Sequence, residues 1–253
     1  MKLRKRQRHA AQARMAILLM AAMAVASLYN TRAAAQQAQS EQLRNAAERS
    51  ETAAKIINTI MELPAEEGVP REVVEKAEAV AVIPRVLKMK VLFQAGTKGY
   101  GVVSRRVPGG WTLPAYYGFG GSSFEASIVG GESVDLIIFF MNEKMVEYFQ
   151  KGRFEFERER KADAGTVGAG IHKPFLERAN VLIYTLKNGK LAGLEIENDF
   201  WSQFVLNPDN NINSKLYHKK GRDVLARKPV NTQSLPAGVQ AYQQALPRYS
   251  VRP

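Results

Sequence analysis

Residues 99–121, GYGVVSRRVPGGWTLPAYYGFGG, place short β-branched and aromatic runs between pairs of glycines. The same alternation extends over residues 91–141, where turn signals recur at intervals of roughly ten residues. Such regular spacing is typical of antiparallel hairpins in a sandwich or barrel. Residues 134–141 (VDLIIFFM) are nearly all apolar after Asp135, which predicts a buried strand.

The segments before this region predict two helices and one more strand. From Ser50 to Leu63 apolar residues recur at three- and four-residue spacing, which indicates an amphipathic helix that ends before Pro64. Pro70 suits the first turn of a second helix. Residues 79–83 (AVAVI) then predict a strand stopped by a proline.

The segments after it predict a further helix and hairpin. Asn142 can cap a short helix over residues 143–151, and Asn188-Gly189 joins two strands in the strongest short hairpin signal. Residues 228–253 are rich in Pro, Gln and Ala and are predicted to form a loosely docked tail, in which residues 237–246 are a candidate short helix. The sequence therefore predicts a single α+β domain, in which N-terminal helices flank a curved, barrel-like antiparallel sheet.

The N-terminus has the layout of a secretory signal peptide. Six basic residues and no acidic one lie within residues 2–14, followed by the apolar run 15–29 and three alanines at 33–35. The apolar run is shorter than the roughly 20 residues that span a bilayer core, so an uncleaved anchor is the less favoured alternative. Residues 1–35 are expected to direct export. The mature protein would then be periplasmic or extracellular and peripherally associated with a membrane.

Export changes what the charge implies. The whole chain carries a formal net charge of +12, but seven of its 36 basic residues and none of its 24 acidic residues precede residue 36. The remainder carries only +5, beginning with the polar spacer 36–49. No nucleic-acid partner is expected, and the small excess suits weak attraction to an anionic surface.

The chain offers few residues for catalysis. It has no cysteine, which excludes disulfides, thiolate zinc sites and cysteine nucleophiles. Of its three histidines, His9 falls in the predicted signal peptide, while His172 and His218 lie on unrelated segments. No serine occupies a Gly-x-Ser-x-Gly context, so a Ser-His-Asp hydrolase is disfavoured.

Cofactor and metal motifs are equally weak. The glycines at 96, 99 and 101 lack both the P-loop lysine and the following helix of a dinucleotide fold. The alternation of Glu155, Glu157 and Glu159 is interpreted as a solvated strand edge rather than a metal site. No cofactor, metal or catalytic residue is therefore expected.

Two clusters suggest binding instead. Residues 85–90 (RVLKMK) alternate cations with apolar residues, and each cation would contribute about 1 kcal/mol beside an anionic membrane. If this stretch is extended, residues 85, 87 and 89 share one face and residues 86, 88 and 90 the other. An ordinary basic loop over a core edge is an equal alternative. The aromatic group Trp111, Tyr116, Tyr117 and Phe119 suits a membrane interface, although barrel filling is favoured for Trp111.

A set of ordered motifs carries a family resemblance. They are residues 80–84 (VAVIP), 99–105 (GYGVVSR), 110–114 (GWTLP), 121–125 (GSSFE), Asp135, 141–142 (MN), 163–165 (DAG) and 189–197 (GKLAGLEIE). In this order they resemble the SYLF lipid-binding domain family, and the resemblance assigns residues 50–227 to that domain. The sequence departs from the family pattern at Gly168-Ala169-Gly170 and at Tyr217-His218-Lys219, where the family has other residues. Both positions are expected to be turns.

The resemblance implies a non-catalytic module that binds phosphoinositides and other anionic lipids through its N-terminal helix and nearby cations. It nominates as lipid-binding Arg49, Lys55, Arg85, Lys88 and Lys90, and as membrane-facing apolar residues Ile56, Ile60, Leu87 and Met89. The actin link of eukaryotic members is not expected in an exported protein. A structural or adaptor protein of the envelope that binds another protein is the alternative, and a hydrolase is less favoured still.

Overall fold

The computed structural model describes residues 36–91, 94–122, 133–156, 162–168, 173–194, 204–226 and 235–249. The predicted signal peptide, residues 1–35, lies outside these residues. The chain forms two compact units, residues 1–44 and 45–253, and the fold described below is that of the second unit. A helix over residues 36–62, called helix 36–62, includes the predicted polar spacer 36–49 and enters the second unit at Asn45.

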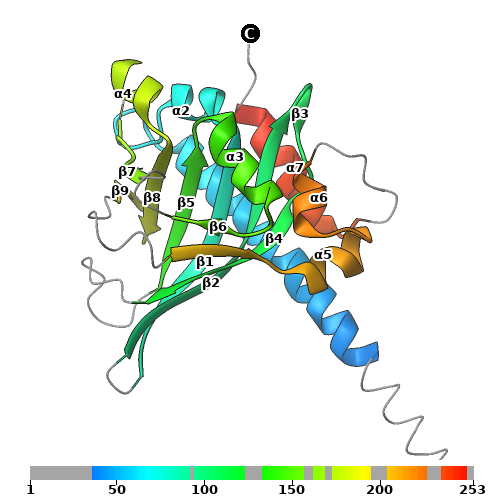
Figure 1. Cartoon of the computed structure of the whole chain (residues 1–253). Helices are drawn as coiled ribbons and strands as arrows, with labels where there is room; N and C mark the ends of the chain where they lie inside the picture. The colour runs from blue at the N-terminus through cyan, green and yellow to red at the C-terminus, as the bar shows by residue number, and fades with distance from the viewer. Residues whose placement is uncertain are drawn as a thin grey trace, which may run out of the picture. The chain divides into compact units, whose positions relative to one another are not determined.

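One curled sheet dominates this unit (Figure 1). Its strands are β1 Ala79–Val91, β2 Gln94–Val107, β3 Gly110–Trp111, β4 Ala115–Ser122, β5 Val134–Phe140, β6 Phe154–Glu155, β7 Ala162–Ala164, β8 Val181–Lys187, β9 Lys190–Gly193 and β10 Phe204–Pro208. They follow the order β6-β10-β4-β2-β1-β5-β8-β7, with β3 beside β2 and β9 beside β8. All pairs are antiparallel except β7 with β8. The predicted α+β class with a curved antiparallel sheet is confirmed, and the sheet curls into a half-barrel.

The helices labelled in Figure 1 are between 5 and 13 residues long. They are α2 Arg71–Lys76, α3 Glu143–Gln150, α4 Lys173–Arg178, α5 Asn210–Tyr217, α6 Gly221–Leu225 and α7 Ala237–Tyr249. The predicted cap of α3 is confirmed, because the Asn142 side chain accepts a hydrogen bond from the Met145 backbone N–H. The loop between β8 and β9 turns at Asn188-Gly189, where both residues have positive φ, as the hairpin signal predicts.

Consecutive residues of β4 show how both faces of the sheet are buried. Tyr116 faces helix 36–62, where its hydroxyl shares a 2.7 Å hydrogen bond with Ser50. Tyr117 faces α3, where its ring lies edge-on to Phe149 at a centroid distance of 5.5 Å. A sheet covered on both faces needs apolar residues at successive positions, which explains the unbroken apolar runs of β1 and β5.

The aromatic group that suited a membrane interface belongs to the core. Trp111, Tyr116, Tyr117 and Phe119 are each at most 8% exposed. The membrane interpretation of this group is therefore wrong, because its rings fill the space between the sheet and its covering helices. Barrel filling is the role they share.

The candidate helix in the C-terminal tail is confirmed and extends over Ala237–Tyr249, but the prediction that this part of the tail is loosely docked is wrong. α7 is a helix of 13 residues that buries Val239, Tyr242 and Leu246 against the rest of the unit. Its Gln243 side chain donates to the Thr112 carbonyl at 2.9 Å, and the Tyr249 hydroxyl donates to the Glu62 carboxylate at 3.0 Å. The C-terminal helix is thus an integral part of the fold.

Gly238→Ala should test how tightly α7 is docked. A Cβ at residue 238 would lie 2.0 Å from the Ala47 carbonyl oxygen, a backbone atom of helix 36–62. Alanine ordinarily stabilises a helix by about 1 kcal/mol relative to glycine, so an observed loss would report the clash. We expect a net loss of about 2 kcal/mol in urea unfolding and faster hydrogen exchange over residues 237–249. Gln244→Ala, on the exposed side of α7, is the control, and a stabilising Gly238→Ala would contradict the tight docking.

Candidate functional site

The two predicted cations of helix 36–62 point in different directions. Six residues separate Arg49 from Lys55, which places them about 120° apart around a helix. Lys55 is exposed and pairs with Glu51 one turn earlier at 2.7 Å. Arg49 is half-buried against the sheet. The helix therefore does not present them on one face.

The assignment of Ile56 and Ile60 as membrane-facing is wrong for this fold. Ile56 is 5% exposed and Ile60 is fully buried, and both belong to the core between helix 36–62 and the sheet. The apolar stripe of this amphipathic helix is used for packing within the domain.

Strand β1 carries the other predicted residues, with a break at Arg85. Arg85 is exposed and has a left-handed backbone with φ 49°, and the register of β1 shifts on both sides of it. Its backbone N–H donates to the Asp135 carboxylate at 2.8 Å. The predicted alternation from residue 85 is therefore wrong at its first position. Leu87, Lys88, Met89 and Lys90 resume regular pairing with β2, and their side chains lie outside the described residues.

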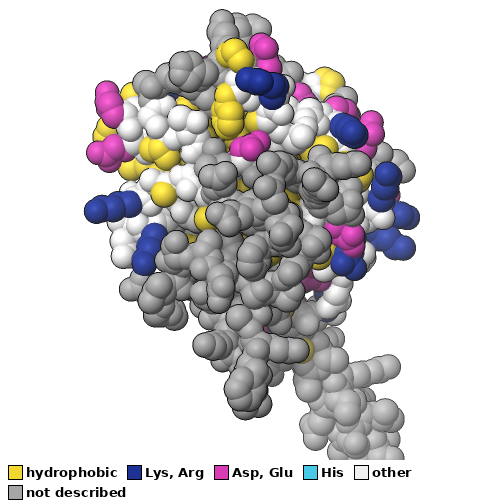
Figure 2. All heavy atoms as spheres, turned by 60° about the vertical axis from the view of Figure 1, so that its left-hand side comes forward, with side chains coloured by type: hydrophobic (Ala, Val, Ile, Leu, Met, Phe, Trp, Pro, Cys, Tyr) yellow, Lys and Arg dark blue, Asp and Glu magenta, His cyan; other side chains and the backbone are white. Residues whose placement is uncertain are grey.

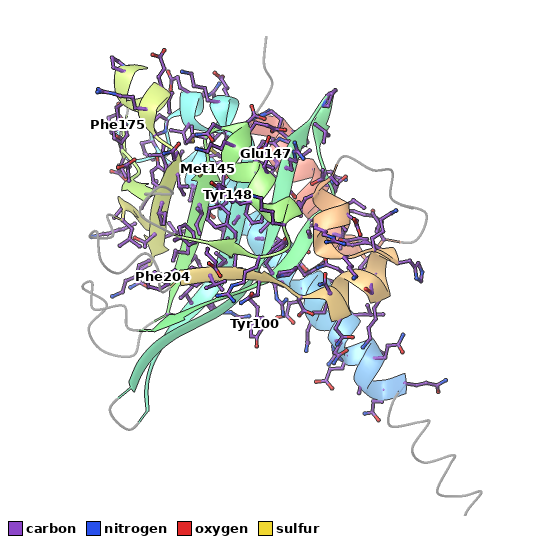
Figure 3. All side chains as sticks on the ribbon, viewed as in Figure 1. Tyr100, Met145, Glu147, Tyr148, Phe175 and Phe204 are labelled. Atoms are coloured by element: carbon purple, nitrogen blue, oxygen red, sulfur yellow. The ribbon has the colours of Figure 1, made fainter. Side chains whose placement is uncertain are left out.

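Arg49 lies in an aromatic cradle formed by β2 and β4. Its guanidinium carbon is 5.1 Å from the centroid of the Tyr100 ring and 5.9 Å from that of Tyr116, both within cation–π range. Tyr100 is the one large apolar or aromatic side chain among the described residues that is substantially exposed, at 43%. It pairs with Gly118 in the middle of the ladder between β2 and β4 (Figure 3). We call these two residues the Arg49–Tyr100 pair.

The hydration that the Arg49 guanidinium loses on burial is only partly replaced by contacts with the protein. Burial lowers the pKa of Arg49, while the Asp209 carboxylate and the nearby Tyr116 and Tyr100 oppose that shift. Its Nη1 is buried and has no hydrogen-bond partner among the described residues. Asp209 caps α5 by accepting from the Ile212 N–H at 3.2 Å, and no ion pair joins it to Arg49 within the described part of the chain. A partly dehydrated cation with an unused donor is suited to binding an anion.

Tyr116 is held rigidly below this cation. Its backbone N–H donates to the Asn213 side-chain oxygen at 2.8 Å, and the Asn213 amide donates back to the Tyr116 carbonyl at 2.9 Å. The Tyr217 ring stacks on it at 6.3 Å. Burial raises the pKa of the Tyr116 hydroxyl above its ordinary value, although the hydrogen bond with Ser50 opposes this shift. Tyr116 is therefore neutral near pH 7, and its ring is a fixed contact surface for the Arg49 guanidinium.

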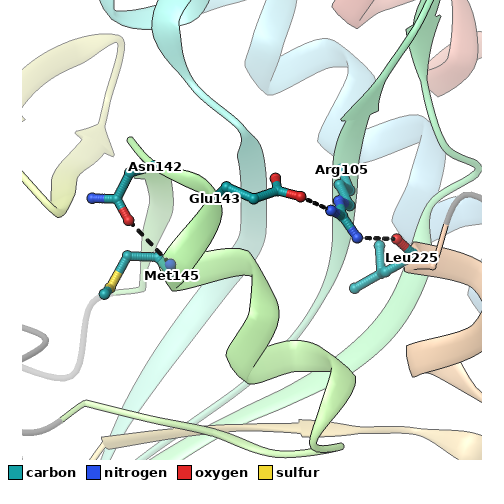
Figure 4. A network of polar contacts seen from close by, with 5 residues as sticks. All are labelled: Arg105, Asn142, Glu143, Met145 and Leu225. Carbon is teal, nitrogen blue, oxygen red and sulfur yellow. Dashed lines mark hydrogen bonds and ion pairs between the residues drawn. The ribbon is translucent and has the colours of Figure 1, made fainter.

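Two adjacent arginines at the end of β2 have structural roles. Arg105 donates to the Glu143 carboxylate of α3 and, at 3.3 Å, to the Leu225 carbonyl of α6 (Figure 4). Arg106 faces the other way, donates to the Ala77 carbonyl at 2.7 Å and lies 4.3 Å from the centroid of the Trp111 ring. Both are buried, with exposed fractions of 4% and 8%. They tie three helices to the sheet and are not available to a ligand.

The described residues on the face that Figure 2 shows carry charges of both signs. Figure 2 shows Lys and Arg side chains interspersed with Asp and Glu on the face that carries α4 and β8, without a patch of one sign. Within the described ranges, no three His, Cys, Asp or Glu side chains gather as metal ligands. None of the described helices is both long and apolar enough to cross a membrane.

The second half of the chain matches a known protein family. A family model, Ysc84, described as "Las17-binding protein actin regulator", matches residues 122–249. The chain belongs to the Ysc84 family. This confirms the SYLF resemblance, and the Ysc84 (SYLF) family consists of binding domains associated with lipid and actin. No curated protein matches the chain.

The Ysc84 match includes α7 and accommodates both departures from the SYLF pattern. Gly168 and His218 each have a positive φ, of 97° and 54°, and His218 ends α5 in the left-handed conformation. Both positions are therefore turns, as expected. Among the residues that carried the resemblance, Gly99 and Gly101 let β2 approach the irregular part of β1, where a Cβ would meet Ile83 at 2.6 Å and Val82 at 2.2 Å. These two glycines of the family signature therefore maintain the fold.

The sequence identified Arg49 and the basic stretch 85–90 but missed Tyr100 and Asp209 as neighbours of Arg49. A tyrosine between two glycines, Gly99-Tyr100-Gly101, was the available signal. Its exposure depends on which helix covers β2, and that is a tertiary property.

Proposed function

We propose that this Ysc84 domain is a non-catalytic module that binds anionic, phosphoinositide-like head groups and associates peripherally with a membrane of the cell envelope after export. The N-terminal segment 1–35 supports export through its signal-peptide layout, and its removal would leave a domain with a modest positive charge. The family's association with lipids supports the ligand class.

The observation that carries the proposal is the β1–β2 hairpin. Residues 85–100 contain four basic residues and no acidic one. β1 pairs with β5 only as far as Val86, whereas its pairing with β2 continues from Leu87 to Val91. On the other side of the hairpin β2 stays paired with β4 as far as Gly96, so the hairpin extends well beyond β5 while only its tip extends beyond β4 (Figure 1). A projecting ribbon of one sign of charge can approach a membrane surface without disturbing the core.

Vesicle sedimentation of the full chain tests this function. Vesicles that contain phosphatidylglycerol should bind the chain better than vesicles of phosphatidylcholine alone, and salt should release it. Lys88→Gln/Lys90→Gln should weaken binding to the anionic vesicles by about 30-fold, since each cation contributes about 1 kcal/mol. All variants share residues 1–35, so the contribution of this basic and apolar segment is the same in each and cancels when variants are compared.

The matched control removes the same charge elsewhere. Lys190→Gln/Lys220→Gln changes two exposed lysines outside the hairpin and should leave most of the binding intact. Equal binding to anionic and neutral vesicles would contradict the proposal and favour an adaptor that binds another protein. Equal effects of the two double variants would mean that net charge, and not the hairpin, drives association.

A further inference from the structure

The Arg49–Tyr100 pair has features that a general membrane contact does not require. Arg49 reaches from helix 36–62 to rings on two strands, at 5.1 Å and 5.9 Å, so its guanidinium is positioned by the tertiary fold. An exposed arginine that only contributed charge would gain nothing from this partial burial, which costs hydration.

The donors of this guanidinium are not exhausted by the protein. Nη1 is buried without a hydrogen-bond partner among the described residues, an arrangement that costs free energy until an acceptor is supplied. The neighbouring carboxylate, Asp209, already accepts from the Ile212 N–H. The cation is therefore attracted to Asp209 without being paired to it.

The surroundings favour a small anion at this point. Tyr100 supplies a half-exposed ring beside the guanidinium, and Tyr116 closes the inner side as a buried, neutral ring. Arg49 as a whole is only half-buried, so part of its side chain is reached from solvent. The basic hairpin, whose second strand carries Tyr100, adds positive potential next to it and so favours a highly charged anion over a single carboxylate.

We propose that the Arg49–Tyr100 pair is a binding site for a phosphate group. The planar guanidinium offers two parallel N–H donors that match two phosphate oxygens, and the Tyr100 ring holds that plane in place. The inference deepens the proposed function, because a lipid head group is one source of such a phosphate. A free phosphate or soluble phosphate ester has the same chemistry and is the other source.

Calorimetric titration of the full chain with inorganic phosphate and with glycerol phosphate tests the site directly. Arg49→Lys keeps the charge but loses the fork of donors, and we expect it to weaken binding by about tenfold or more. Tyr100→Leu removes the ring that orients the guanidinium and should weaken binding in the same direction. Arg71→Lys, at an exposed position of α2, is the matched control and should leave the affinity unchanged.

Vesicles that carry phosphatidic acid distinguish the two sources. If Arg49→Lys weakens binding to both the soluble phosphates and these vesicles, the site takes the head group. If it weakens only the soluble phosphates, the site takes free phosphate. Phosphate binding that depends on Arg49 in a chain that ignores anionic vesicles would support this site while sinking the proposed membrane function.

The inference is overturned if neither soluble phosphate nor phosphatidic acid vesicles bind. It is also overturned if Arg49→Lys and Arg71→Lys behave alike. Circular dichroism and the thermal midpoint establish that each variant is folded. If Arg49→Lys unfolds, Tyr100→Leu decides the matter, because an exposed side chain can be changed with little effect on stability.

Discussion

Gly101→Ala should destabilise the domain by about 3 kcal/mol, at the upper end of the usual cost of overpacking. A Cβ at residue 101 would lie 2.2 Å from the Val82 carbonyl oxygen and 2.8 Å from the Ile83 Cα. Both are backbone atoms of β1, so no side-chain rotation can relieve the overlap. Because β1 lies between β2 and β5 in the middle of the sheet, moving it disturbs both pairings.

Urea unfolding followed by circular dichroism measures this effect, and the neighbouring strand provides its control. Gly118 lies in β4, and a Cβ there would meet its nearest atoms only at 3.8 Å, an ordinary contact. Gly118→Ala should therefore be close to neutral. Equal losses for the two variants would show that the cost comes from replacing strand glycines in general and not from the approach of β1 to β2.

Glu143→Ala should destabilise the domain by about 2 kcal/mol, because it leaves Arg105 as an uncompensated buried cation. The Arg105 side chain is 5% exposed and Glu143 is 46% exposed, so solvent screening reduces the cost below that of a fully buried pair. The Arg105 Nε also lacks a partner among the described residues, which increases its dependence on the Glu143 carboxylate. Figure 4 shows how this contact links α3 to β2.

Glu147→Ala, an exposed acidic residue of the same helix, is the control for helix propensity and net charge. The double variant Glu143→Ala/Arg105→Met should recover part of the lost stability, since replacing both partners by apolar groups removes the stranded charge. If Glu143→Ala and Glu147→Ala have the same effect on the urea midpoint, the contact does not stabilise the fold as described.

Most of the fold could be predicted because its signals are local. The Asn142 cap, the Asn188-Gly189 turn and the apolar runs of β1 and β5 each follow from a few neighbouring residues, and the structure confirms them. The predicted stop of β1 at the proline is wrong, because the strand continues through Pro84 to Val91. The docking of α7 could not be predicted in this way. Its buried Val239, Tyr242 and Leu246 are diluted by Gln, Ala and Pro, so that composition suggested a tail.

The candidate site was less predictable, because orientation is a property of the assembled sheet. An amphipathic stripe has the same spacing whether it faces a membrane or a sheet, which is why Ile56 and Ile60 were wrongly assigned to a membrane. The left-handed conformation of Arg85 depends on an acceptor 50 residues away, Asp135. Similarly, the setting of Arg49 depends on rings from two later strands.

The contact between α7 and helix 36–62 has a consequence for synthesis. Helix 36–62 packs against α7, the last helix described. Gly238 lies close to Ala47, and the Tyr249 hydroxyl donates to the Glu62 carboxylate. The fold of this unit is therefore complete only after residues 237–249 have been synthesised, long after helix 36–62 itself.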